Sequence, residues 1–211
     1  MPIAKLPLTL PEYERVFRVI YSVIDDHANT PHACMFFSFV GALILEQKLK
    51  IKATPIAGAS VLYVDAISNN AITFGEFTDG VLTSHREAFH CWVQTKDFAI
   101  DFMAPIFNES VQSRGYQGVI PRKMFQRPLD HIVDSLSDLQ KPGDFALSPN
   151  PDLTKELLGK FMDSPASTDL ANVCLTWFTK YPRLLPPLSM MNDLGETYPL
   201  TLKGPSISGA W

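Results

Sequence analysis

Apolar residues recur every three or four positions over segment 10–26, LPEYERVFRVIYSVIDD. This spacing is typical of one face of an amphipathic helix. Pro11 and Glu12 suit the first turn of such a helix. The residues expected on the buried face are Val16, Phe17, Ile20 and either Val23 or Ile24.

The next segment, TPHACMFFSFVGALIL at 30–45, is apolar nearly all round, which predicts a central buried helix running to about Gln47. Asn29 or Thr30 can cap this helix, and Pro31 suits its first position. Gly41 in its middle would allow another element to approach closely. Cys34 therefore lies close to the N-terminus of a core helix.

After Lys50 the pattern changes to runs rich in β-branched and aromatic residues. These runs cover 51–67, 71–77 and 89–103, and turn-like SNN and TDG sequences separate them. We expect an antiparallel sheet of roughly three to five strands packed on the Cys34 helix. Because helices precede a run of strands, the predicted fold class is α+β.

Beyond residue 108 the periodic signal is weaker, and prolines interrupt it. Two helices are expected at 152–162 and 168–181, and the Pro- and Gly-rich segment 182–211 is expected to be irregular. The sequence thus predicts a single domain over 1–211. Its α+β core would cover 1–107, and a helical and Pro-rich extension would cover 108–211.

Composition narrows the functional class. The chain is 46% hydrophobic and 19% charged, as in a folded globular protein, and its net charge of −4 without a basic patch argues against nucleic acid as a ligand. The apolar run 35–45 is too short to span a membrane, and the N-terminus does not resemble a secretory signal. Three cysteines are too few for a disulfide framework, so we expect a cytoplasmic protein.

The sharpest local pattern is the segment HCWVQTKDFAIDFM at 90–103. If Lys96 and Asp97 form a two-residue turn, a hairpin follows whose two faces differ in chemistry. One face carries His90, Trp92, Gln94, Ala99, Asp101 and Met103, and the other carries Cys91, Val93, Phe98, Ile100 and Phe102. Asp101 would then lie diagonally across from His90. A three-residue loop would instead place Asp101 on the wrong face.

Cys34, His90 and Asp101 together suit nucleophilic catalysis. A helix N-terminus and a neighbouring imidazolium both favour the thiolate form of a cysteine, which is its nucleophilic form. A carboxylate orients the histidine and stabilises its charged form. Free N–H groups near Cys34 could bind a developing oxyanion, with Asn29 and His32 as additional side-chain donors.

The order of a cysteine on a helix, a histidine on a strand and an aspartate on the next strand resembles the papain-like cysteine peptidase superfamily. The matching stretches are TPHAC with its apolar helix, AFHCWV and FAIDF. Its transglutaminase-like and arylamine N-acetyltransferase-like branches are the most similar, as is an uncharacterised bacterial family placed near them. The resemblance spans about 11–105 and implies that Cys34 is the nucleophile, His90 the acid and base, and Asp101 the orienting residue.

Each of these residues also has a structural interpretation. Cys34 can be a small buried residue, His90 a core histidine, and Asp101 a partner of backbone N–H groups or of Arg86. Trp92 suits packing better than substrate contact. Cys91, on the apolar face, is interpreted as an inert core thiol. His27, His32 and Cys34 do not follow a zinc-ligand spacing, so no metal is expected.

The sequence therefore predicts a thiol-dependent hydrolase or acyltransferase that attacks an amide, ester or thioester carbonyl through an acyl-enzyme. Its substrate would be a peptide, a protein or a small acyl compound, and no cofactor is needed. The alternative is a non-catalytic binding module with the same fold. Two features motivate it: Cys34 lacks the Gly-rich or Trp-rich context of papains, and the Pro-rich C-terminal segment could wrap a partner or cover the cleft.

Overall fold

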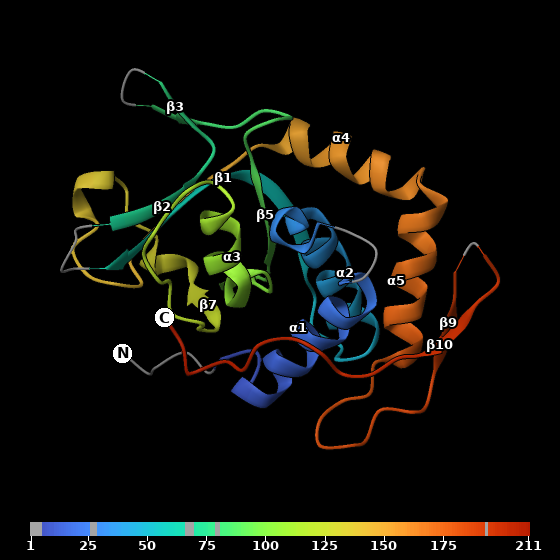
Figure 1. The fold of residues 1–211 in the computed structure, drawn as a ribbon. Coiled ribbons are helices and arrows are strands. Elements are labelled where there is room, and N and C mark those ends of the chain that lie inside the picture. The colour runs from blue at the N-terminus through green and yellow to red at the C-terminus, as the bar shows by residue number, and fades with distance from the viewer. Residues whose placement is uncertain (1–5, 26–28, 66–69, 79–80, 193) are drawn as a thin grey trace.

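The computed structural model describes residues 6–211 except 26–28, 66–69, 79–80 and 193. The protein is a mixed α+β structure in which a curled antiparallel sheet packs against helices (Figure 1). Helices α1 (Leu10–Ile24) and α2 (Cys34–Gln47) come first in the chain, followed by most of the strands, as the sequence predicts. None of the described helices has the length and apolar character needed to cross a membrane.

Helix α1 begins with a polar cap and buries one apolar stripe. The N–H and Oγ1 of Thr9 both donate to Glu12, at 3.0 and 2.9 Å, which fixes the first turn. The predicted buried face is confirmed, since Val16, Phe17 and Ile20 are fully buried. This face packs against α2 and α5 (Pro165–Trp177).

Helix α2 starts later than predicted. Thr30–His32 forms a separate 3-10 helix, so Asn29 precedes this short turn and does not cap α2. Ala33 is the N-cap of α2, and Cys34 is its first residue. The prediction that Gly41 allows close approach is confirmed, because a Cβ atom there would lie 2.4 Å from the ring of Phe102.

Within the described residues, six strands form the main sheet. Strand β1 (Thr54–Asp65) is its centre and pairs with β2 (Asn70–Phe74), β5 (His90–Gln94) and β8 (Phe145–Pro149). Strand β6 (Phe98–Asp101) pairs with β5 and with β7 (Phe125–Pro128). The sheet curls so that the rings of Phe125 and Phe145 meet edge-on at 5.1 Å.

The β5–β6 hairpin has the predicted register. Gln94 pairs with Ala99, Val93 pairs with Ile100, and the Thr95 N–H donates to the Phe98 carbonyl at 2.9 Å. The turn therefore contains only Lys96 and Asp97. This parity places His90 and Asp101 on one face of the hairpin.

The second half of the chain is integrated into the same core. Strands β7 and β8 complete the sheet begun before residue 107, so the main sheet has more strands than expected and crosses the predicted boundary. Helix α4 (Pro151–Met162) packs on β1 and begins close to prediction, with Asn150 as its cap. Helix α5 starts and ends earlier than the predicted 168–181, because Ser164 caps it and Phe178 is already extended.

Shorter elements complete the fold. They are the hairpin β3 (Glu76–Thr78) and β4 (Val81–Thr83), the 3-10 helix Ala104–Ile106 with α3 (Phe107–Gln112), the 3-10 turns Leu129–His131 and Leu136–Asp138, and the hairpin β9 (Ser189–Met191) and β10 (Thr197–Pro199). The β9–β10 hairpin lies within 182–211, so this segment is more regular than expected. After β10 the chain is largely irregular and runs along α1 towards β7 (Figure 1). The Lys203 N–H donates to Ser22 Oγ at 2.7 Å, and the Trp211 N–H donates to the Met124 carbonyl at 3.0 Å.

Candidate active site

Cys34 occupies the start of an uncapped helix. Among the described residues, no side chain caps the N-terminus of α2, and its first turn contains no acidic residue. The first N–H groups of an α-helix have no partner within the helix, and they carry the positive end of its dipole. Helix α2 therefore presents these donors and this partial charge beside the Cys34 thiol.

His90 and Asp101 are joined directly, at the two strand ends that the hairpin brings together. His90 Nε2 lies 2.5 Å from Asp101 Oδ2, and both side chains are almost fully buried. The second carboxylate oxygen, Oδ1, accepts a hydrogen bond from the Met103 N–H at 2.9 Å. The Tyr13 hydroxyl donates to the backbone carbonyl of Asp101, which ties the end of β6 to α1.

Aromatic rings fix the plane of the His90 imidazole. Phe74 stacks on it with ring centroids 4.4 Å apart, and Phe107 meets it edge-on at 5.6 Å. Because Nε2 is bound to Asp101, Nδ1 is the ring nitrogen left for another group. Nδ1 is buried and makes no regular hydrogen bond with the described residues, while the ring interacts closely with Cys34.

The pKa of Cys34 is lowered from its ordinary value, and the pKa of His90 is raised. A hydrogen bond with the Cys91 thiol contributes most to lowering the pKa of Cys34, burial opposes it, and His90 lowers it further, to about 5. Burial disfavours the imidazolium, but the charge and hydrogen bond of Asp101 and the facing Cys34 outweigh it and raise the pKa of His90 to about 10. Both shifts favour a thiolate beside an imidazolium at neutral pH.

Cys91 is a part of the site that the sequence interpretation missed. It is buried, as predicted, and its pKa is raised well above the ordinary value, first by its hydrogen bond with Cys34 and then by burial. A protonated Cys91 thiol can therefore donate to the Cys34 thiolate. Cys34 therefore interacts with two consecutive residues of β5, His90 and Cys91.

A small cavity opens onto the site. It has a volume of about 160 Å³, and its lining includes Cys34, His90, His32, Glu87 and Arg114. His32 is exposed and lines the cavity, with Nε2 3.3 Å from Ser113 Oγ. Its role as an oxyanion donor stays a prediction. Asn29 is exposed and does not line the cavity.

Trp92 lies beside His90 and Asp101 and does not line the Cys34 cavity. It is buried and lines a separate narrow space of about 20 Å³ beside His90 and Asp101. Its backbone carbonyl accepts a hydrogen bond from Ser38 Oγ at 2.6 Å, which links β5 to α2. The packing interpretation of Trp92 therefore fits its position.

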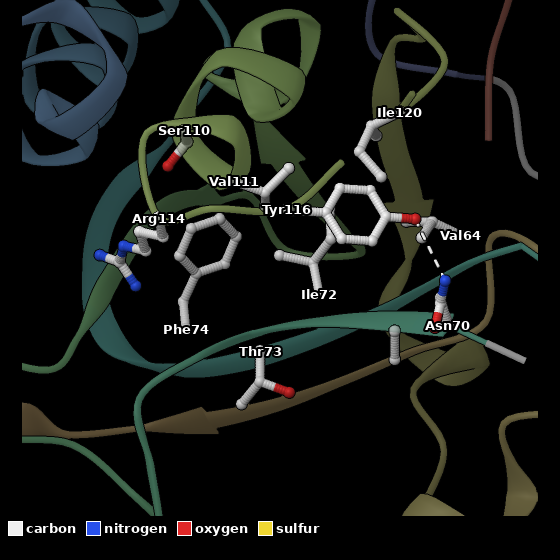
Figure 2. A pocket seen from close by; sticks show the side chains of 11 residues that line it. Val64, Asn70, Ile72, Thr73, Phe74, Ser110, Val111, Arg114, Tyr116 and Ile120 are labelled. Atoms are coloured by element: carbon white, nitrogen blue, oxygen red, sulfur yellow. Dashed lines mark hydrogen bonds between the residues drawn. The ribbon is translucent and has the colours of Figure 1, made fainter. Parts of the chain in front are cut away.

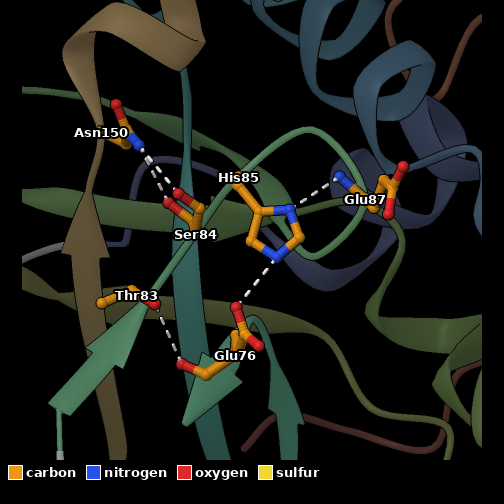
Figure 3. A network of polar contacts seen from close by, with 6 residues as sticks. All are labelled: Glu76, Thr83, Ser84, His85, Glu87 and Asn150. Carbon is orange, nitrogen blue, oxygen red and sulfur yellow. Dashed lines mark hydrogen bonds and ion pairs between the residues drawn. The ribbon is translucent and has the colours of Figure 1, made fainter. Parts of the chain in front are cut away.

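The segment that leads into β5 is held by polar contacts (Figure 3). Asn150 Nδ2 donates to the carbonyl and hydroxyl oxygens of Ser84, both at 3.2 Å. His85 lies between Glu76, at 3.1 Å, and the Glu87 N–H, at 3.3 Å. This network fixes the chain a few residues before His90 and orients the Glu87 side of the cavity.

Other sequence candidates are engaged elsewhere. Arg86 pairs with Glu156 at 2.6 Å, so Asp101 has His90 as its partner. Within the described ranges, no group of three potential metal ligands comes together. His27, the third member of the weighed metal cluster, lies outside the described residues. Among the residues that the structure describes, none from the C-terminal segment 182–211 lines the Cys34 cavity.

The fold and site define an α+β protein with a buried Cys–His–Asp constellation at a helix N-terminus. The chain belongs to DUF2026, a family of proteins of unknown function, which it matches over residues 9–211. It is also similar to a solved structure described as "The crystal structure of genomics APC5867", with 32% identity, a TM-score of 0.83 and full coverage of both chains. No curated protein matches.

Proposed function

We propose that this protein is a thiol-dependent hydrolase or acyltransferase of papain-like or transglutaminase-like type, acting on an amide, ester or thioester. The observation that carries the proposal is the arrangement of Cys34, His90 and Asp101 beside a cavity that reaches the thiol. The order of the three residues along the chain and their placement on helix, strand and strand support the superfamily assignment. Three free cysteines agree with a reducing compartment, as proposed for a cytoplasmic protein.

In the first half-reaction, the Cys34 thiolate attacks the substrate carbonyl carbon and forms a C–S bond. The N–H groups at the start of α2 are placed to stabilise the oxyanion that develops on the carbonyl oxygen. The His90 imidazolium then donates its proton to the leaving nitrogen, oxygen or sulfur as that bond breaks. The product is an acyl-enzyme with neutral His90.

In the second half-reaction, His90 accepts a proton from water or an amine, which attacks the acyl carbon. The C–S bond breaks, the acyl group leaves, and the thiolate–imidazolium pair is restored. Asp101 keeps its charge throughout and holds Nε2, so that Nδ1 faces the sulfur. Met103 and Tyr13 in turn fix the position of Asp101.

The test is the pH dependence of iodoacetamide labelling at Cys34, followed by mass spectrometry of the labelled peptide. The wild-type protein should label with a midpoint near pH 5, because the thiolate is already formed there. His90→Ala should raise the midpoint by about two pH units, because the imidazolium is lost while the Cys91 donor remains, and should slow labelling at pH 6 by roughly tenfold.

His131→Ala is the matched control, since this histidine is exposed, contacts Asp130 and does not line the Cys34 cavity. It should leave the labelling profile unchanged. A midpoint near 8.5 in the wild type, or a profile indifferent to loss of His90, would refute the enzyme proposal. The non-catalytic binding module would then be the better interpretation of the fold.

A further inference from the structure

A second cavity adjoins the one at Cys34. It has a volume of about 260 Å³ and lies between β2, the end of α3 and the loop that follows (Figure 2). Three residues, Phe74, Ser110 and Arg114, line both cavities. The two cavities therefore meet along these three residues, one at the thiol and the other extending away from it.

The walls of the second cavity are mainly apolar. Ile72, Val111 and Ile120 surround its middle in Figure 2. At one end the Asn70 amide donates to the Tyr116 hydroxyl at 3.1 Å, so these two polar groups satisfy each other. A cavity of about 150 Å³ is enough to hold a benzene ring. The available space thus suits a compact apolar group.

Arg114 supplies a positive charge at the shared wall. Its side chain is exposed, and it forms no ion pair with any residue the structure describes, Glu87 across the cavity included. By contrast, nearby Arg122 is held by both oxygens of Glu109, at 2.9 and 2.5 Å. The Arg114 guanidinium is therefore available to pair bidentately with an external carboxylate.

We propose that the substrate class is the N-acyl amino acid, with a compact apolar acyl group in the second cavity and its carboxylate on Arg114. The scissile carbonyl would then lie at Cys34, between the two anchoring groups. The carboxylate of an amino acid is only a few bonds from its amide carbonyl, which matches a cation that lines both cavities. This inference rests on the proposed function, since it assigns the substrate of the same thiol.

The experiment measures protection of Cys34 from iodoacetamide by three matched ligands. N-benzoylglycine carries both the ring and the carboxylate, N-benzoylglycinamide lacks the charge, and N-acetylglycine lacks the ring. N-benzoylglycine should half-protect the thiol at a concentration about tenfold or more below that of its amide, the ratio that one charge-assisted hydrogen bond supplies. It should also protect at a lower concentration than N-acetylglycine, because only the benzoyl ring buries apolar area in the second cavity. This comparison uses the wild-type protein and depends on no variant.

Two substitutions separate the contribution of the carboxylate from that of the apolar acyl group. Arg114→Gln should remove the advantage of the acid over its amide and keep the advantage of benzoyl over acetyl. Val111→Phe narrows the second cavity, so it should remove the advantage of benzoyl over acetyl and keep the advantage of the acid over its amide. Arg183→Gln, an exposed arginine in the C-terminal segment, is the matched charge control and should change neither ratio.

The outcomes distinguish this inference from the proposed function. If Cys34 labels at low pH but the acid and its amide protect equally, or no ligand protects, the substrate assignment is overturned and the thiolate remains. If Cys34 does not label at low pH, the proposed function fails first. An Arg114→Gln protein that still prefers the acid would also overturn the assignment.

Discussion

The pKa values of two buried cysteines, Cys34 at the start of α2 and Cys174 in α5, are shifted in opposite directions. Cys174 is fully buried, and burial raises its pKa far above the ordinary thiol value. Cys34 is 7% exposed, yet its pKa falls to about 5. The difference comes from the neighbours, because only Cys34 has a thiol donor, an imidazole and a helix N-terminus beside it.

The comparison shows that burial alone does not decide whether a cysteine is reactive. Desolvation opposes the thiolate at both positions, and at Cys34 the local donors outweigh it. At Cys174 neither an imidazole nor a second thiol of the described residues opposes burial, so burial sets the direction of the shift.

The largest expected effect follows from removing the charge of Asp101. In Asp101→Asn the His90 pKa should fall from about 10 by at least roughly two units, towards its ordinary value of about 6.5. The sign follows from charge: the carboxylate favours the imidazolium, so its loss releases the proton at lower pH. The measurement is the ¹⁵N chemical shift of the imidazole nitrogens against pH.

Asp97→Asn is the matched control for that variant, because Asp97 lies in the exposed turn of the same hairpin. It should leave the His90 titration unchanged. An unchanged midpoint in Asp101→Asn would mean that Asp101 does not set the protonation of His90.

A smaller effect is expected at Cys91. In Cys91→Ala the Cys34 thiolate loses a hydrogen-bond donor, so the midpoint of its labelling should rise by about one to two pH units. Cys91→Ser keeps a donor at that position and should show the smaller rise of the two. Equal midpoints in wild type and Cys91→Ala would remove Cys91 from the site.

The smallest effect on reactivity is expected at Cys174. Cys174→Ala should leave the labelling midpoint of Cys34 unchanged and lower the free energy of unfolding by about 1 kcal/mol, because it removes one buried atom from the core. Urea denaturation measures the second quantity. A shift in the Cys34 midpoint would show that the two environments are not independent.

Local pattern was sufficient to predict the hairpin that carries His90 and Asp101. Side chains alternate strictly along a strand, and the two-residue turn at Lys96 and Asp97 fixed the register. The three-to-four-residue spacing of apolar positions predicted α1, and the length of the apolar run predicted the end of α2. These features depend on residues close in sequence.

Features that depend on distant residues were missed. The pairing of β8 with β1 joins segments more than eighty residues apart, and no local pattern specifies that partner. The contact between Cys34 and Cys91 was also missed, because the parity argument assigns a face and does not consider a neighbour at the strand end. Arg114 carried no signal either, since its role depends on cavities that only the folded chain forms.

Gly41 touches no reacting atom, yet it determines how near the sulfur can come to the imidazole. Its missing side chain lets α2 lie directly on Phe102, the residue after Asp101. Any larger residue there would push the helix away from the hairpin and widen the gap between nucleophile and base. A side chain at position 41 would therefore act on the thiol from two helical turns away, through the position of α2 on the hairpin.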